Sequence, residues 1–208
     1  MEKEAILKAL RELRKDKKRK FQQTVDLVIN LRNFDPKKQS LNTVVAVPYK
    51  VKDGKVCAFF SKESELVDTI PKSDFVKYKD KKAMKQLIKK YDSFIASAQL
   101  MPSVATSFGK VLGPAGKMPS PQLGILPSED KQAVKDLLGR INKLIKIKTK
   151  EASLKLSVGK EDLKDEEIAE NVLAVYKKVF EELPRKKENI RSVLIKFTMS
   201  KPIKISID

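Results

Sequence analysis

The amino-acid sequence predicts an α/β protein of two domains, with a small α/β domain inserted into a discontinuous one. Residues 57–146 alternate short apolar segments with helical ones, which is typical of a small parallel or mixed sheet flanked by helices. The segments before and after this stretch are each too short for a domain, so we expect them to fold together. Hydrophobic residues make up 41% of the 208, enough for such cores. We therefore expect residues 1–56 and 150–208 to form one domain and residues 57–149 the inserted one, with a hinge at the two crossings.

The first part of the chain predicts one helix and two strands. Apolar residues at helical spacing predict an amphipathic helix over residues 4–14, which runs into a basic stretch at 14–20. Residues 24–31 alternate apolar and polar side chains, the period of a half-buried strand. We expect a connecting turn at 33–38 and a second strand at 42–49.

The same criteria predict the remaining elements. Strands are expected at 57–60 and 93–98, and helices at 80–91, at 102–111 with Pro102 in the first position, and from a cap at Ser128 to about residue 146. A strand within 147–158, a helix through 168–179 that Pro184 ends, and strands at 190–199 and 203–207 complete the chain.

Residues 109–121 contain three of the seven glycines and three prolines. Glycine permits positive φ and proline fixes φ, so this composition predicts a shaped loop that carries Gly113, Gly116 and Lys117. A nucleotide-binding P-loop is not supported, because Met118 stands where that motif needs a hydroxyl for Mg²⁺. We expect a structured connection with incidental lysines.

Charge and composition favour a nucleic-acid partner. The chain has 45 Lys and Arg against 27 Asp and Glu, a net charge of +18, and a polyanion is the partner that such a surplus suits best. A membrane is a weaker candidate, since the chain lacks Trp and only 6% of its residues are aromatic. The chain has no His and a single cysteine, Cys57, which excludes His/Cys zinc sites, His-dependent catalysis and intrachain disulfides. We expect Cys57 to be a buried small hydrophobe in a soluble, intracellular protein without a cofactor.

Four segments, in this order, resemble the ribosomal protein L1 family in its archaeal form. They are residues 18–27, residues 112–119, Val158-Gly-Lys with Glu170-Asn171, and residues 191–199. The resemblance implies a discontinuous α+β RNA-binding domain interrupted by a Rossmann-like α/β domain. It also implies a structural constituent of the large ribosomal subunit that binds large-subunit rRNA and forms the mobile stalk at the exit site. Such a protein assists release of deacylated tRNA, and many members repress translation of their own mRNA. The resemblance further implies a non-enzymatic protein, cytoplasmic and ribosome-bound, monomeric off the ribosome, with no membrane partner.

The resemblance also implies which residues contact RNA. The family's contact segments fall on Arg19, Lys20, Phe21, Thr24 and Asp26, on Thr198, Met199, Ser200 and Lys201, and, in a third segment, on Lys160. Lysine binds phosphate, an exposed Phe can pack on a ribose or base, and a carboxylate can accept from a 2′-OH or a base amine. Without the resemblance, Phe21 is better interpreted as a core residue and Asp26 as a solvated one.

The chain departs from the family pattern at three positions. Ser200 replaces a glycine that lets the backbone approach RNA, and Phe197 replaces a threonine. Ala115 stands where many relatives carry arginine, so we expect little RNA contact from the inserted domain and expect affinity to reside in the discontinuous one.

Two other functions remain open from the sequence. One is a ribosome-assembly factor of the same fold, which would normally be longer and carry basic tails. The other is a carboxylate-dependent Mg²⁺ enzyme acting on RNA, which needs acidic residues that converge at strand ends. The acidic residues instead cluster at the start of one predicted helix, where they favour the helix dipole: Glu161, Asp162, Asp165, Glu166 and Glu167.

Overall fold

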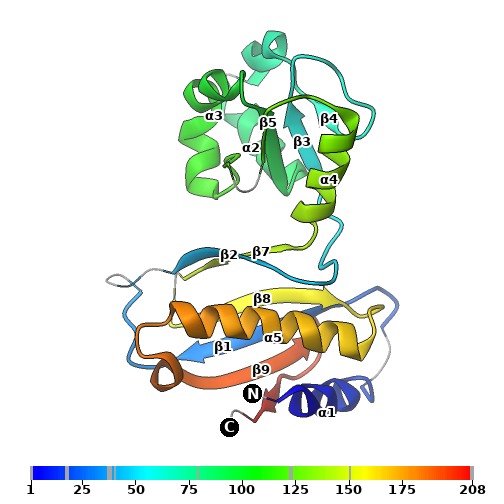
Figure 1. Ribbon diagram of the computed structural model, residues 1–208, viewed down its shortest axis with the longest axis vertical. Helices are drawn as coiled ribbons and strands as arrows, with labels where there is room; N and C mark the ends of the chain where they lie inside the picture. Colours follow the sequence, from blue (N-terminus) through cyan, green and yellow to red (C-terminus); the bar gives the residue numbers. More distant parts are fainter. Residues whose placement is uncertain are drawn as a thin grey trace. The chain divides into compact units, whose positions relative to one another are not determined.

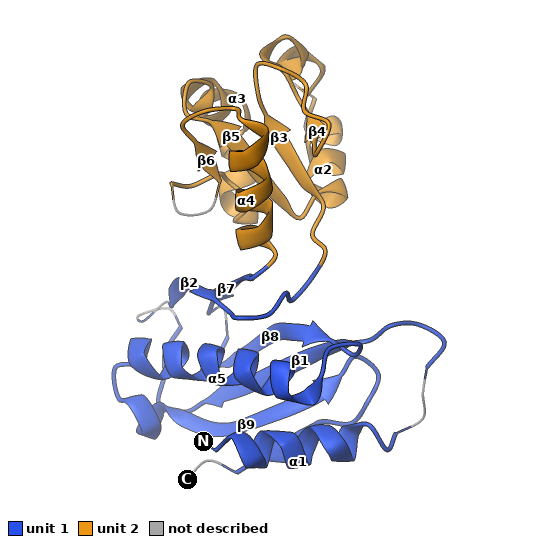
Figure 2. Ribbon diagram, turned by 45° about the vertical axis from the view of Figure 1, so that its right-hand side comes forward, with its two compact units in different colours: residues 1–52, 143–208 blue, residues 53–142 orange. Residues whose placement is uncertain are grey.

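The protein folds into two compact units, and the predicted α/β class is confirmed (Figure 2). The computed structural model describes residues 2–16, 19–36, 39, 41–78, 80–121, 124–149 and 151–206. Unit 1 comprises Met1–Lys52 and Lys143–Asp208, and unit 2 comprises Asp53–Asn142. The chain crosses between the units earlier than the sequence suggests, because residues 144–148 form a strand that pairs within unit 1.

Unit 1 is built on a four-stranded antiparallel sheet with β1 (Thr24–Leu31) between β8 and β9. The strand order is β10-β9-β1-β8. Helices α1 and α5 contact each other, and α5 crosses in front of the strands in Figure 1. A two-stranded antiparallel ribbon of β2 and β7 also contacts α5 and β8. The bounds are α1 Lys3–Leu13, β2 Asn42–Ala46, β7 Leu144–Lys148, β8 Ser153–Lys160, α5 Asp165–Glu182, η2 Lys186–Asn189, β9 Ile190–Phe197 and β10 Ile203–Ile205.

The alternation along β1 determines which face of the sheet the helices cover. Val25, Leu27 and Ile29 are fully buried in the core with the apolar faces of α1 and α5. The residues between them, among them Thr24 and Asp26, are half-buried and lie on the opposite face, since successive strand side chains alternate. No described helix packs on the opposite face, which carries Thr24, Asp26 and Asn30 together with the apolar Val28.

Buried Asn171 fixes the segment that leads from β2 toward unit 2. Its side-chain oxygen accepts from the Tyr49 amide at 3.0 Å, and its amide donates to the carbonyls of Tyr49 at 3.2 Å and Val158 at 2.9 Å. A fully buried amide needs such partners, because an unpaired polar group in a core costs about 1–3 kcal/mol. The Glu170-Asn171 motif thus includes a structural residue of the scaffold.

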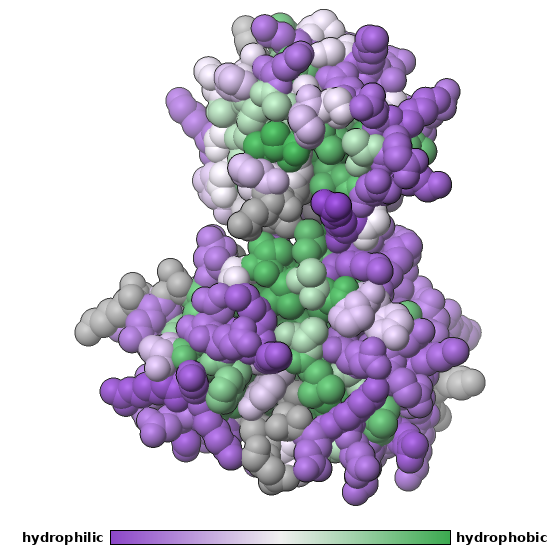
Figure 3. Space-filling model, in the orientation of Figure 1, coloured by the Kyte–Doolittle hydropathy of each residue, from purple (hydrophilic) through white to green (hydrophobic). Residues whose placement is uncertain are grey.

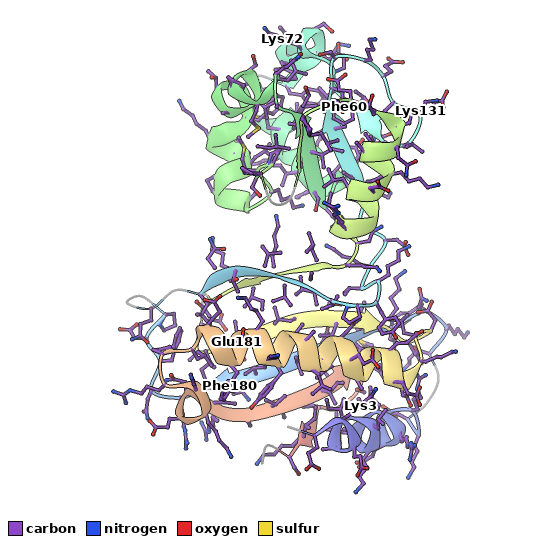
Figure 4. The ribbon with its side chains drawn as sticks, in the orientation of Figure 1. Lys3, Phe60, Lys72, Lys131, Phe180 and Glu181 are labelled. Carbon is purple, nitrogen blue, oxygen red and sulfur yellow. The ribbon has the colours of Figure 1, made fainter. Side chains whose placement is uncertain are left out.

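Unit 2 is a small α/β fold with a parallel sheet of order β4-β3-β5-β6. Residues of β3 are buried on both faces: α2, α3 and η1 contribute to the core on one side, and α4 packs on the other. Phe60 lies inside this unit, and Lys131 projects from the outer side of α4 (Figure 4). The bounds are β3 Val56–Phe59, β4 Asp68–Thr69, η1 Lys72–Tyr78, α2 Lys81–Lys90, β5 Ser93–Ser97, α3 Met101–Ala115, β6 Ile125–Leu126 and α4 Lys131–Ile141.

The prediction for Cys57 is confirmed, because its side chain is completely buried in the core of unit 2. Burial raises the pKa of the thiol to about 12. The residue therefore stays a neutral thiol at neutral pH and packs as an apolar side chain.

Several predicted element boundaries are wrong for local reasons. Asp130, not Ser128, precedes the first turn of α4, and the Ser128 hydroxyl bonds the Asp130 carboxylate at 2.6 Å. The same helix ends at Ile141, because the chain then enters β7. The strand expected within 147–158 is two strands, β7 and β8, and the elements β4, η1, β6 and η2 were not predicted.

Parts of three predicted segments lie outside the described residues. They are residues 17 and 18 of the basic stretch, residues 37 and 38 of the turn, and residue 207 of the last strand. Within the described part of the chain, no helix combines the length and the apolar character that a membrane crossing requires.

Candidate nucleic-acid interface

The two predicted contact segments meet where β1 begins and β9 ends. Val25 pairs with Phe197 in the antiparallel register, so Thr24 and Thr198 lie opposite each other just beyond that pair. The Thr24 amide donates to the Thr198 hydroxyl at 3.1 Å, and the two hydroxyl oxygens are 2.9 Å apart. The Thr198 amide in turn donates to the Thr24 carbonyl at 3.1 Å. Residues 174 positions apart in the sequence thus form one cluster.

Gln23 connects this cluster to the third predicted segment. Its side-chain oxygen accepts from the Met199 backbone amide at 3.1 Å, and its backbone amide donates to the Glu161 carboxylate at 3.3 Å. The Glu161 amide donates back to the Gln23 carbonyl at 2.9 Å, and Lys160 is the β8 partner of Thr24. Gln23 is itself buried, so its contacts hold the three segments in a fixed arrangement. Sequence patterns gave no signal for this role.

Large apolar side chains are exposed on both contact segments. Phe21 is 53% exposed and Met199 is 59% exposed, and only Leu66 and Val76 share this property among the described residues. The interpretation of Phe21 as a core residue is therefore wrong. The cationic residues Arg19, Lys20 and Lys201 on the same segments are exposed too. We name this surface the Thr24–Thr198 cluster: Arg19, Lys20, Phe21, Thr24, Lys160, Thr198, Met199 and Lys201.

Asp26 lies two residues further along β1, on the open face of the sheet. Its cross-strand neighbours are Ser157 on β8 and Lys196 on β9. Partial burial raises the pKa of the Asp26 carboxyl, and the positive charge of Lys196 opposes that rise. No described side chain donates a hydrogen bond to this carboxylate. It remains available to accept one from a ligand.

A second polar group lies on the open face at Asn30, separated from Asp26 by the apolar pair of Val28 and Leu194. The Asn30 amide donates to the Ser192 hydroxyl at 3.0 Å, and the Ser153 hydroxyl donates to the Asn30 side-chain oxygen at 3.0 Å. These residues line a shallow hollow at the far end of the sheet from Thr24. Sequence analysis missed Ser153 and Ser192, because only strand register brings them beside Asn30. Figure 3 shows the other, helix-covered side of unit 1, where hydrophilic side chains flank a hydrophobic strip.

The departures from the family pattern at Phe197 and Ser200 have local structural roles. Phe197 is buried at the end of β9, where it packs in the core of unit 1. The Ser200 hydroxyl accepts from the Phe197 amide at 2.8 Å, and the Ser200 amide donates to the Phe197 carbonyl at 3.1 Å. Ser200 therefore closes the turn that presents Thr198 and Met199.

The Gly/Pro stretch of unit 2 begins as a helix, which corrects the predicted loop. Helix α3 continues through Gly113 and Pro114, and its end is marked by Gly116, whose φ of 67° only glycine adopts readily. Proline is tolerated because its φ suits a helix, and only one hydrogen bond is lost in the last turn. Lys117 is partly buried, and its ammonium donates to the carbonyls of Ile88 and Tyr91, both at 2.7 Å. This lysine closes the C-terminus of α2.

Asp165 and Glu167, two of the acidic residues at the start of α5, bond to different partners within unit 1. Asp165 accepts from the Arg14 guanidinium at 2.6 Å. The same guanidinium donates to the backbone carbonyls of Glu161 and Leu163, just before α5 begins. Glu167 accepts from the Lys164 amide at 3.2 Å, which caps the first turn. In the part of the chain that the structure describes, no three His, Cys, Asp or Glu side chains gather as a metal site would need.

Comparisons with known proteins agree on one family. The family model described as "Ribosomal protein L1p/L10e family" matches residues 13–201. The chain is 38% identical to the large ribosomal subunit protein uL1 of Thermofilum pendens, over 98% of this chain and 92% of that protein. It is 32% identical to the uL1 proteins of Nanoarchaeum equitans, over 94% and 97%, and of Archaeoglobus fulgidus, over 99% of each.

Proposed function

Because the chain belongs to the ribosomal protein L1p/L10e family, we propose that it is a non-catalytic protein of the large ribosomal subunit that binds large-subunit rRNA. The observation that carries this proposal is the Thr24–Thr198 cluster. There, two hydroxyls lie 2.9 Å apart on segments that also bear the exposed Phe21 and Met199. Exposed apolar side chains beside hydroxyls and cations suit an RNA surface, where bases stack and riboses and phosphates accept hydrogen bonds.

Each group in the cluster has a distinct role in the proposed complex. Arg19, Lys20 and Lys201 bind phosphates and position the RNA, without reading its sequence. Phe21 and Met199 pack on a ribose or on an unstacked base. The threonine hydroxyls bond 2′-hydroxyls or base edges, and the Asp26 carboxylate accepts from a 2′-OH or a base amine. Lys160, the strand partner of Thr24, adds a cation at the β8 edge of the cluster.

The finer role follows from the family resemblance. The protein binds a helical junction of the rRNA and forms the mobile stalk at the exit site, where it assists the departure of deacylated tRNA. It also binds a mimic of that junction in its own mRNA and represses translation. The protein is cytoplasmic and ribosome-bound, and monomeric when free.

Two substitutions in the cluster test the proposal directly. Thr198→Val and Phe21→Ala should each cost the complex with the rRNA junction fragment about 1–3 kcal/mol, without changing the salt dependence of binding. Exposed residues of unit 2 provide matched controls: Thr106→Val and Leu66→Ala should leave the affinity unchanged. Folded Thr198→Val and Phe21→Ala variants that bind the fragment as tightly as wild type would refute the assignment.

A further inference from the structure

Helix α2 of unit 2 presents three lysines on a single outward face. Lys82, Lys85 and Lys89 are all exposed, and their spacing of three, four and seven residues places them on one side of the helix. Gln86 lies among them, and the helix contains no acidic residue. We call Lys82, Lys85 and Lys89 the α2 lysine face.

None of these three lysines holds an ion pair with a described residue, and they differ from other such lysines of unit 2 in lying together on one helix face. Ion pairs form instead between Lys77 and Asp74 at 2.9 Å, between Lys131 and Glu65 at 2.8 Å, and between Lys90 and Asp68 at 3.6 Å. The acidic residue before the helix, Asp80, directs its carboxylate to the Lys82 backbone amide at 3.4 Å. The charge of the α2 lysine face is therefore not balanced within the described part of unit 2.

The other side of α2 is already occupied, which excludes insertion into a membrane. Leu87 is buried, and Met84 and Ile88 pack against the core of unit 2. An interfacial membrane helix needs its apolar face free to enter lipid. The side that remains exposed offers only ammonium and amide groups.

We propose that the α2 lysine face is a second, sequence-independent contact surface for the phosphate backbone of RNA. Seven residues of helix span about 10 Å, over which one strand of a duplex presents about three phosphates. Lysines act as flexible point charges, so three of them can each meet a phosphate without a fixed geometry. An acidic protein fits less well, because protein interfaces usually contain a hydrophobic centre and this face has none.

This surface lies on a different unit from the Thr24–Thr198 cluster and goes beyond the function proposed for it. The proposal also revises the expectation from the Gly/Pro stretch, which gave unit 2 little part in RNA binding. A contact to phosphates adds affinity for any RNA and leaves the preference for one RNA to unit 1.

The test compares two triple variants of the full chain with equal net charge. Lys82→Gln, Lys85→Gln and Lys89→Gln remove the face, while Lys62→Gln, Lys110→Gln and Lys135→Gln remove three exposed lysines elsewhere in unit 2. Lys and Gln have similar helix propensity, so both variants should melt like wild type. Binding to an RNA duplex of arbitrary sequence is then titrated over a salt series, with poly-glutamate as a second probe.

We expect the α2 variant to bind the duplex about tenfold more weakly at low salt, and its salt slope to fall by about 2–3, since each phosphate contact contributes about 0.9. The control variant, which lacks Lys62, Lys110 and Lys135, should lose much less affinity and show a much smaller change in salt slope. The preference for the rRNA fragment over the duplex should persist in the α2 variant, whereas Thr198→Val reduces that preference and spares duplex binding. Equal losses in the two triple variants would show that only net charge matters and would overturn the proposal. Loss of poly-glutamate binding with duplex binding intact would overturn it in favour of an acidic protein partner.

Discussion

At the scale of single residues, Asp26 carries opposing demands of stability and recognition. Its carboxyl is half-buried on the open sheet face, and burial raises its pKa above the ordinary value. A raised pKa means that the folded state holds the proton more tightly than the unfolded state does. Folded-state stability is therefore lost as pH rises from the unfolded pKa through the folded one, and the charged carboxylate is a cost at neutral pH.

Asp26→Asn should consequently separate the two demands. At neutral pH the free variant should melt at a higher temperature than wild type, and this difference should shrink as pH falls through the raised pKa. Its complex with the rRNA fragment should weaken by about 1–3 kcal/mol, because a charge-assisted bond to the carboxylate is replaced by a weaker bond to an amide oxygen, and the Asn NH₂ group takes the place of the second acceptor. Electrostatics alone predicts the opposite, since removing a negative charge favours RNA. Thermal melts across pH and binding titrations check both parts, and tighter rRNA binding by the variant would contradict the role given to Asp26.

The family resemblance identified the residues of the Thr24–Thr198 cluster. Hydrophobic periodicity and charge alone predicted only some of their positions. Alternation along β1 placed Thr24 and Asp26 on one polar face, as observed. The meeting of Thr24 with Thr198 depends on strand register, which no local pattern encodes. The exposure of Phe21 is also invisible locally, because an aromatic residue before a strand is more often buried.

At the scale of elements, Lys117 shows how a residue of an apparent anion loop serves the fold. Its ammonium satisfies two carbonyls at the C-terminal end of α2, where a positive charge also complements the helix dipole. Lys117 thereby links the segment after α3 to α2. The C-terminal end of α2, next to the α2 lysine face, is held in place by these bonds.

Lys117→Met should destabilise unit 2 by about 1–3 kcal/mol, because charge-assisted bonds to partly buried carbonyls are lost. Hydrogen exchange should accelerate in the last turn of α2, while binding of the rRNA fragment by unit 1 stays unchanged. Lys110→Met, at an exposed position on α3, is the matched control. Unaltered exchange in α2 would show that the lysine is not the cap.

The prediction of helices and strands succeeded where the hydrophobic period repeats several times, and it failed for elements too short to show a period. The eight residues of β1 match their predicted bounds, since alternation over that length is distinctive. Strands β4 and β6 have two residues each, too few to show a period. Helix α3 extends beyond its predicted end at residue 111, because Gly113 and Pro114 are residue types that predict a loop, although the last turn of the helix accommodates both.

At the scale of the whole molecule, the net charge of +18 and the specific contacts have separate effects. Cations spread over both units attract any RNA at low salt, and that attraction falls steeply as salt rises. The Thr24–Thr198 cluster adds hydrogen bonds and stacking that depend little on salt. The two contributions therefore divide between a general affinity and a preference for one RNA.

Removal of unit 2 tests this division most directly. Unit 1 has its own core. The Gly54 amide donates to the Asn142 side-chain oxygen at 3.4 Å, which places the two crossings side by side, so a short Gly/Ser linker can join residues 52 and 143. The affinities of unit 1 and of the full chain for the rRNA fragment and for an unrelated RNA are measured across a salt series. We predict that folded unit 1 keeps the preference for the rRNA fragment to within about tenfold, with a smaller salt slope for both RNAs. A folded unit 1 that no longer distinguishes the two RNAs, while isolated unit 2 does, would contradict the account.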